Sequence, residues 1–235
     1  SLDPSQYYAR LGQNIITSIT ALTSEGRLYE VDTRLRPSGN QGPLVVTLDT
    51  FRDYYSKQAW IWEHMALTRA RIITEPIAFK GKLLTEIRTI LTKERDHKSL
   101  LTSVIDMRQK LWDANKTENP WSVKHVRGGL IDIEFICQYL LLKEGGRYPD
   151  IFSSNIDTAL TQLEKRALLD TEVANDLISA RAFMQNIQAV LRLCLGEVIK
   201  DDEFSIGLKE ILCRSAKVET FEELKETLLR LLILI

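Results

Sequence analysis

The stretch Tyr29-Glu30-Val31-Asp32-Thr33-Arg34-Leu35-Arg36-Pro37 decides how this chain is interpreted, because charged and apolar side chains alternate along it. In an extended segment every second side chain lies on the same face. The two acids and two arginines, at positions 30, 32, 34 and 36, are therefore expected on one face, opposite the apolar residues 29, 31 and 35. The alternation predicts a strand with one apolar and one ionic face.

The ionic face combines groups that bind a nucleoside triphosphate. A carboxylate can hold a divalent cation, and arginines can grip phosphate oxygens with two parallel hydrogen bonds. We therefore take Asp32 as the candidate catalytic and metal-binding residue, and Arg34 and Arg36 as candidate phosphate ligands. The alternative from spacing alone is a half-exposed strand whose charged side chains form internal salt bridges.

A single carboxylate does not complete such a site, because metal-assisted attack on a triphosphate generally uses two cations bridged by several acids. Two places with acid-x-acid spacing imitate such a pair, namely Glu30 with Asp32 and Asp132 with Glu134, the latter following Gly128-Gly129. The second pair lies in an apolar run, 130–142, that does not alternate and so favours a helix. On a helix these two acids point in different directions, and acids in a first turn commonly stabilise the helix dipole.

The Trp60-Ile61-Trp62-Glu63-His64 block lies in a predicted helix and is followed by Arg69 and Arg71. These two arginines are candidates to reach the phosphates beside those at positions 34 and 36. The alternative is that the block packs in the core with a capping salt bridge. His64 alone is weak evidence for acid–base chemistry.

A small basic group, Lys124, His125 and Arg127, precedes the predicted helix at 130–142. It could hold an anion or be solvated.

The composition bounds the class of protein. With 235 residues, 44% of them hydrophobic, the chain can bury a sizeable core. Lys and Arg number 31 against 32 for Asp and Glu, and this net charge of -1 argues against nucleic acid as a partner. Cys137, Cys194 and Cys213 lie far apart in apolar contexts, which predicts reduced core cysteines in a cytosolic protein. We expect neither an export signal nor a membrane span.

Apolar periodicity predicts a mainly α fold with a small antiparallel β element near its start. An amphipathic helix is expected over 5–22, then a hairpin of strands 29–36 and 44–46 around the turn at 37–43, and then a long helix over 47–70. Further helices are expected over 77–94, 100–115, 130–142, 154–165, 171–195, 205–215 and from 220 to the end, with a linker over 115–121. This organisation predicts two domains, 1–115 and 122–235, the second of them a helical bundle.

Three blocks, at residues 28–39, 59–71 and 128–135, together resemble the glutamine synthetase adenylyltransferase family. Members of that family are long bacterial enzymes with two nucleotidyltransferase halves. One half adds AMP to a tyrosine of glutamine synthetase and the other removes it by phosphorolysis. The Trp-x-Trp-Glu-His block resembles the carboxy-terminal, adenylylating half.

The resemblance implies that the β element is a remnant of a polymerase-beta-like nucleotidyltransferase sheet and that Asp32 is its third catalytic carboxylate. The family's first two acids lie in a Gly-Ser-Asp-x-Asp element, which this sequence lacks. The chain therefore looks like a fragment that starts just after the metal-binding pair, and by itself it is expected to be inactive. Mg²⁺ and ATP are the implied cofactors of the intact enzyme, and two alternatives stay open for the fragment alone, that it binds them and that it binds neither.

Glutamine synthetase, the PII signal protein and glutamine as effector are the implied partners of a cytoplasmic enzyme that regulates nitrogen assimilation. A non-catalytic helical module that docks glutamine synthetase or PII is the alternative, and a piece of a related uridylyltransferase is a third interpretation.

Overall fold

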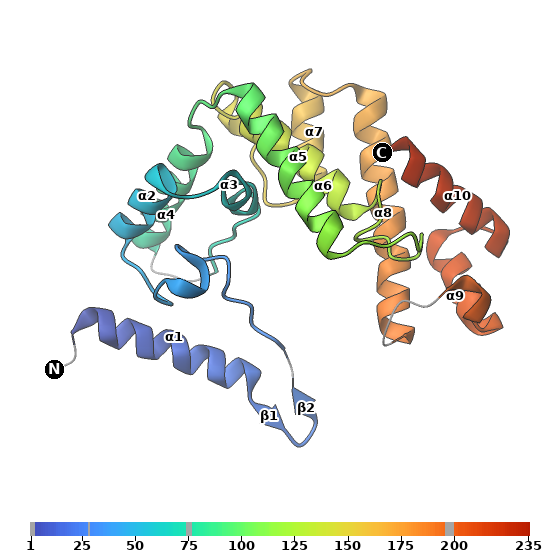
Figure 1. The fold of residues 1–235 in the computed structure, drawn as a ribbon, viewed down its shortest axis with the longest axis horizontal. Helices are drawn as coiled ribbons and strands as arrows, with labels where there is room; N and C mark the ends of the chain where they lie inside the picture. Colours follow the sequence, from blue (N-terminus) through green and yellow to red (C-terminus); the bar gives the residue numbers. More distant parts are fainter. Residues whose placement is uncertain (1–2, 28, 74–76, 196–199) are drawn as a thin grey trace. The chain divides into compact units, whose positions relative to one another are not determined.

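The computed structural model describes residues 3–27, 29–73, 77–195 and 200–235 (Figure 1). The described residues form ten α-helices and a two-stranded antiparallel sheet, which confirms the predicted mainly α class with a small β element. The chain divides into two compact units, residues 1–93 and 94–235.

The first unit begins with α1 (Pro4–Thr20), whose first turn is capped by the Asp3 carboxylate accepting the Ser5 N–H at 3.1 Å. The short strands β1 (Leu22–Thr23) and β2 (Gly26–Arg27) then pair as a tight hairpin. The 3-10 helix η1 (Gly39–Gln41) follows. Three helices come next, α2 (Leu48–Lys57), α3 (Ile61–Leu67) and α4 (Ile77–Leu91), and both α2 and α3 pack against α4. An ion pair of 2.6 Å between Arg52 and Glu86 joins α2 to α4.

The predicted hairpin of strands 29–36 and 44–46 is wrong. Among the described residues the strands lie earlier, at 22–23 and 26–27, and residues 29–34 form neither a strand nor a helix. The turn at 37–43 forms η1 instead of closing a hairpin, since Ser38 and Gly39 have positive φ values of 62° and 53° and the Gly42 N–H bonds back to the Gly39 carbonyl. Alternation alone does not make a strand, because a strand needs a second segment to pair with.

The predicted single helix over 47–70 is also interrupted. Helix α2 ends at Lys57, where the N–H groups of Gln58 and Ala59 both donate to the Tyr54 carbonyl. Helix α3 then begins after Trp60, whose backbone is extended and whose N–H donates to the Glu63 carboxylate at 2.8 Å. This side-chain cap starts a new helix, so the chain bends between the two.

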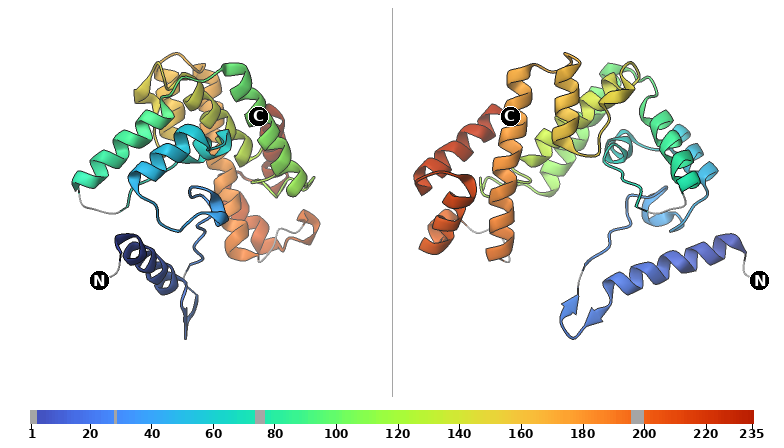
Figure 2. Two further views of the ribbon diagram at one scale, coloured as in Figure 1. Left: turned by 60° about the vertical axis from the view of Figure 1, so that its left-hand side comes forward. Right: turned by 180° about the vertical axis from the view of Figure 1, so that it is seen from behind.

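The second unit is a helical bundle, and Figure 2 shows two further views of it. Its helices, with the two 3-10 turns, are α5 (His97–Ala114), α6 (Leu130–Glu144), η2 (Pro149–Ile151), α7 (Ile156–Lys165), α8 (Thr171–Cys194), η3 (Asp201–Glu203), α9 (Ile206–Ala216) and α10 (Phe221–Leu234). The predicted helices from 130 onward are confirmed. Helix α6 packs against α5, α7 and α8, and Ile133, Cys137 and Leu141 are fully buried, as its nearly continuous apolar sequence predicts.

The segment between α5 and α6 is non-helical, as predicted, and it is fixed by aromatic packing. The Trp121 ring stacks on Phe221 with centroids 5.4 Å apart and meets Phe204 edge-on at 5.1 Å. Gly128 has φ 74°, and a Cβ atom there would lie 1.9 Å from the carbonyl oxygen of Leu232 in α10. Only glycine permits this approach of the two backbones.

The boundary between the two compact units falls after Lys93, whereas the predicted boundary lies at 115–122. The difference arises because α5 packs on α6 and so lies within the second unit. The domain assignment 1–115 and 122–235 itself stays a prediction. Cys137 and Cys213 are buried as expected, whereas Cys194 is exposed, so its predicted core position is wrong.

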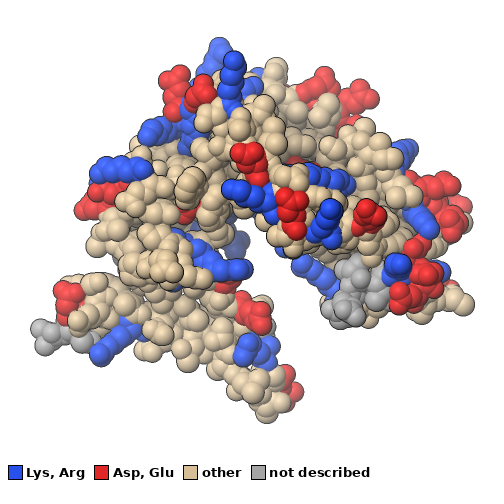
Figure 3. Space-filling view, in the orientation of Figure 1, with Lys and Arg blue, Asp and Glu red and all other residues tan. Residues whose placement is uncertain are grey.

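Two surface properties bear on the class of protein. Basic and acidic side chains are interspersed on the face seen in Figure 3, in keeping with the near-zero net charge. Within the described ranges, none of the helices combines the length and apolarity needed to cross a membrane.

Candidate functional site

Asp32, the first candidate, lies in an exposed ion pair with Arg34. The Arg34 Nε lies 3.0 Å from each carboxylate oxygen, its Nη2 lies 2.7 Å from Oδ2, and its backbone N–H donates to Oδ1 at 2.9 Å. The side chains of Asp32 and Arg34 are 56% and 74% exposed. These hydrogen bonds from Arg34 lower the pKa of Asp32 to about 2. The acid is thus ionised and reachable from solvent, but it already has a cation as partner.

Arg36, the second candidate phosphate ligand, holds its own loop together. Its Nη1 donates to the Thr33 carbonyl at 2.6 Å and to the Thr33 hydroxyl at 2.9 Å, and its Nε donates to the Gly42 carbonyl at 3.4 Å. Gly42 is required at that point, since a Cβ there would lie 2.1 Å from the Pro37 carbonyl oxygen. These bonds tie the two ends of the turn to the extended segment.

Arg69 and Arg71 follow the end of α3 at Leu67, and both are exposed. Arg69 therefore lies beyond the end of α3, although the helix predicted over 47–70 includes it. The described hydrogen bonds of Arg34 and Arg36 stay within residues 32–42, so a cluster of four arginines around one phosphate chain remains a prediction.

The Trp60–His64 block is divided between the surface and the core of the first unit. Trp60 is 70% exposed, whereas Glu63 and His64 are buried. The Glu63 carboxylate accepts the Tyr54 hydroxyl at 2.8 Å as well as the Trp60 N–H, and the His64 ring lies edge-on to Tyr55. Burial first, and then Glu63, raises the pKa of Tyr55 to about 12. The motif thus joins α2 to α3 from the inside.

The described residues do not assemble a magnesium site. They contain no group of three or more His, Cys, Asp or Glu side chains placed to hold a metal ion. Asp32 offers one carboxylate, which is short of the several oxygen ligands that Mg²⁺ requires.

Sequence reasoning missed Arg108, which forms a buried ion pair with Asp132 between α5 and α6. Arg108 donates from Nη2 to the Asp132 Oδ2 at 2.8 Å and from Nε to Oδ1, and the two side chains are only 8% and 17% exposed. The Gly128 N–H also donates to Oδ2, at 2.7 Å. Both oxygens of Asp132 are therefore occupied. A signal for this was present, since Arg108 follows Leu100 and Val104 at helical spacing on a buried face.

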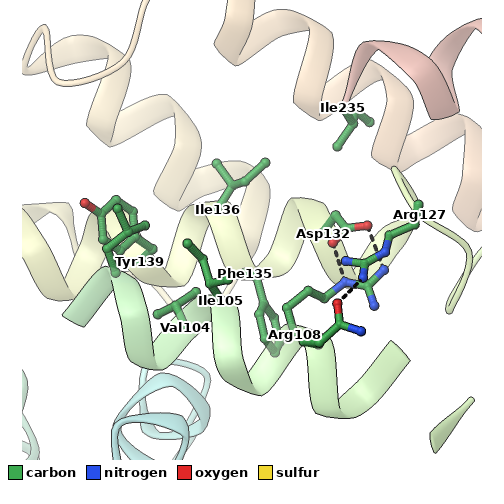
Figure 4. A pocket seen from close by; sticks show the side chains of 11 residues that line it. Val104, Ile105, Arg108, Arg127, Asp132, Phe135, Ile136, Tyr139 and Ile235 are labelled. Carbon is green, nitrogen blue, oxygen red and sulfur yellow. Dashed lines mark hydrogen bonds and ion pairs between the residues drawn. The ribbon is translucent and has the colours of Figure 1, made fainter. Parts of the chain in front are cut away.

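A pocket of about 320 Å³ opens beside this ion pair (Figure 4). Its apolar part is lined from α5 and α6 by Ile105, Phe135 and Tyr139, and its polar end holds Arg108, Asp132 and Arg127. Arg127 donates to the Gln109 side chain at 2.6 Å and lies over the Trp112 ring at 4.8 Å.

Comparison with known proteins covers nearly the whole chain. Residues 1–86 match the family model described as glutamate-ammonia ligase adenylyltransferase, and residues 101–226 match the model described as GlnD PII-uridylyltransferase.

Three similar curated proteins are each named bifunctional glutamine synthetase adenylyltransferase/adenylyl-removing enzyme. The protein from Rhodopseudomonas palustris is 38% identical over 96% of this chain and 23% of its own length. The corresponding values are 37%, 95% and 22% for Xanthobacter autotrophicus, and 38%, 97% and 23% for Brucella suis. The chain thus spans less than a quarter of the length of these relatives. It belongs to the glutamate-ammonia ligase adenylyltransferase family through this similarity and its first 86 residues, and its residues 101–226 belong to the family of the PII-uridylyltransferase model.

Proposed function

We propose that this chain is part of an enzyme that transfers AMP from ATP to a tyrosine of glutamine synthetase and, as a whole enzyme, also removes it by phosphorolysis. The observation that carries this proposal is an identity of 35–38%, over nearly the whole chain, with proteins named bifunctional glutamine synthetase adenylyltransferase/adenylyl-removing enzyme. The reaction would be attack of the tyrosine oxygen on the α-phosphorus of ATP, with positioning and charge neutralisation supplying most of the rate.

In this proposal Asp32 contributes one carboxylate toward magnesium, and Arg34 leaves it to contact phosphate oxygens. The exposure of both side chains supports the exchange, because water and salt screen an exposed ion pair. Arg36, Arg69 and Arg71 are the further proposed phosphate contacts. These 235 residues lack the Gly-Ser-Asp-x-Asp element, so we expect the isolated chain to bind nucleotide weakly without turnover.

Calorimetric titration of the chain with MgATP tests the assignment of Asp32. We expect binding in the native chain and its loss in Asp32→Ala. Asp150→Ala is a matched control, since Asp150 also forms an exposed ion pair with an arginine, Arg166. Absence of binding to the native chain, or equal binding by all three proteins, would refute a nucleotide site at Asp32.

A second candidate is a docking role for the second unit, with glutamine synthetase or PII as partner and glutamine as effector. The apolar pocket between α5 and α6 favours it, because Ile105 on its rim is 57% exposed. Sedimentation of the chain mixed with glutamine synthetase tests this role. Ile105→Asp should abolish a complex that Ile206→Asp, a control at an exposed position on α9, leaves intact. No complex with the native chain would reject it.

A further inference from the structure

A second, more polar pocket in the 94–235 unit has a volume of about 180 Å³ and is separate from the one beside Arg108. It lies between the turn segment 121–125 and the last turns of α8. Its polar lining consists of Ser122, Lys124, His125, Gln188 and Arg192. The described lining includes no acid, so the charged groups there are basic.

The walls of this pocket are fixed by the fold. On one side, His125 donates its N–H to the Ser122 carbonyl at 2.9 Å, and the carbonyls of residues 123 and 124 accept the N–H groups of Leu130 and Ile131 at the start of α6. On the other side, Gln188 and Arg192 are four residues apart within α8 and so share one helical face. The basic groups are therefore held on two rigid elements, which limits the entropy lost when a ligand binds.

His125 has an unmet hydrogen-bonding capacity. Its Nδ1 atom is buried and has no hydrogen-bond partner among the described residues. Burial, followed by the positive charges of Lys124 and Arg108, lowers the pKa of the imidazole. A ligand that supplies a negative charge beside Lys124 would offset the repulsion that these two cations exert on a charged imidazole.

We propose that this pocket binds a small oxyanion, such as a phosphate group or a carboxylate, between Lys124 and Arg192, with His125 as a third contact. Charge complementarity carries the proposal, because two cationic side chains from different elements line a pocket without an acid in its described lining. Since one water takes roughly 30 Å³ of liquid, the volume fits a small anion together with a few waters. The site lies in the second unit, so it is independent of the proposal for Asp32.

An NMR titration of the whole chain at constant ionic strength tests the site. The imidazole signals of His125 are followed as inorganic phosphate, acetate or chloride is added, with His64 and His97 as internal references. We expect a saturable shift of His125 alone with phosphate, with acetate, or with both, and the stronger of the two identifies the anion class. Because each charge-assisted hydrogen bond is strong, Lys124→Gln and Arg192→Gln should each weaken binding by about tenfold.

Lys165→Gln is the matched control, since it removes one exposed positive charge from α7 outside the pocket and should leave binding unchanged. Circular dichroism establishes that each variant is folded. The proposal is overturned if chloride shifts His125 as much as the oxyanions do. It is equally overturned if all three histidines respond alike, or if both pocket variants bind as tightly as the native chain; the basic group is then merely solvated.

Discussion

Removing one partner of the Arg108–Asp132 ion pair should destabilise the second unit strongly. In Asp132→Ala, Arg108 stays almost buried, and its remaining described partners are the carbonyls of His125 and Val126, each at 3.4 Å, and the Trp112 ring at 5.9 Å. Breaking a buried ion pair in this way costs about 3–5 kcal/mol. The Gly128 N–H loses its acceptor as well, which adds about 0.5–1.5 kcal/mol. Because the Asp132 side chain is 17% exposed, water can enter, and we expect a total of about 3–4 kcal/mol.

Urea unfolding followed by tryptophan fluorescence measures this loss. Trp60 and Trp62 lie in the first unit, so replacing both with Phe leaves Trp112 and Trp121 to report on the second unit alone. The expected result is a lower midpoint at an unchanged slope, which indicates a change of stability rather than of the unfolded state. For a protein of this size, each kcal/mol should also lower the melting temperature by about 2–4 °C.

Two further variants separate this ion pair from ion pairs in general. Asp150→Ala breaks a pair with Arg166 in which both side chains are about half exposed, and should cost at most about 1 kcal/mol. The double variant Arg108→Met with Asp132→Leu removes both charges, and should recover most of the stability lost in Asp132→Ala. If Asp132→Ala costs no more than Asp150→Ala, the ion pair does not hold α5 on α6 and the reasoning is wrong.

Three other outcomes follow from local geometry. Gly128→Ala should destabilise the second unit by more than about 2 kcal/mol in the same urea assay, because it combines an unfavourable φ with a clash against Leu232. Glu63→Ala should cost about 1–3 kcal/mol, measured as a lower melting temperature of the first unit, since two donors then lose a buried acceptor. The pKa of Asp32, measured by carboxyl NMR, should be about 2 and should return toward 3.8 in Arg34→Gln. The stabilising contribution of that ion pair is therefore complete above pH 3.8 and is lost as the pH falls toward about 2.

The helices of the second unit could be predicted because their signals are local. Four of the apolar periodicities are preceded by a capping side chain, since Asn155, Asp170, Ser205 and Thr220 each accept a backbone N–H group at the start of a helix. Helix starts of this kind need no knowledge of the rest of the fold.

The misses involve partners that sequence spacing does not reveal. Alternation at 29–36 indicates an extended backbone, but whether it becomes a strand depends on another segment beside it. Likewise, Arg108 and Asp132 lie 24 positions apart and meet only because α5 packs on α6. At Trp60–His64, the spacing did not show which side chains of the block would be buried, and in the structure Glu63 and His64 lie inside while Trp60 is exposed.

The three blocks that carry the family resemblance have different physical roles in this structure. Glu63 joins α2 to α3, while Gly128 and Asp132 hold α6 against α10 and α5, so two of the blocks act through buried contacts. Only the block around Asp32 presents its acid and an arginine to solvent, where a ligand could displace one from the other. If nucleotide chemistry involves this chain, changes at Asp32 should therefore alter ligand binding without unfolding, whereas changes at Glu63 or Asp132 should act first through stability.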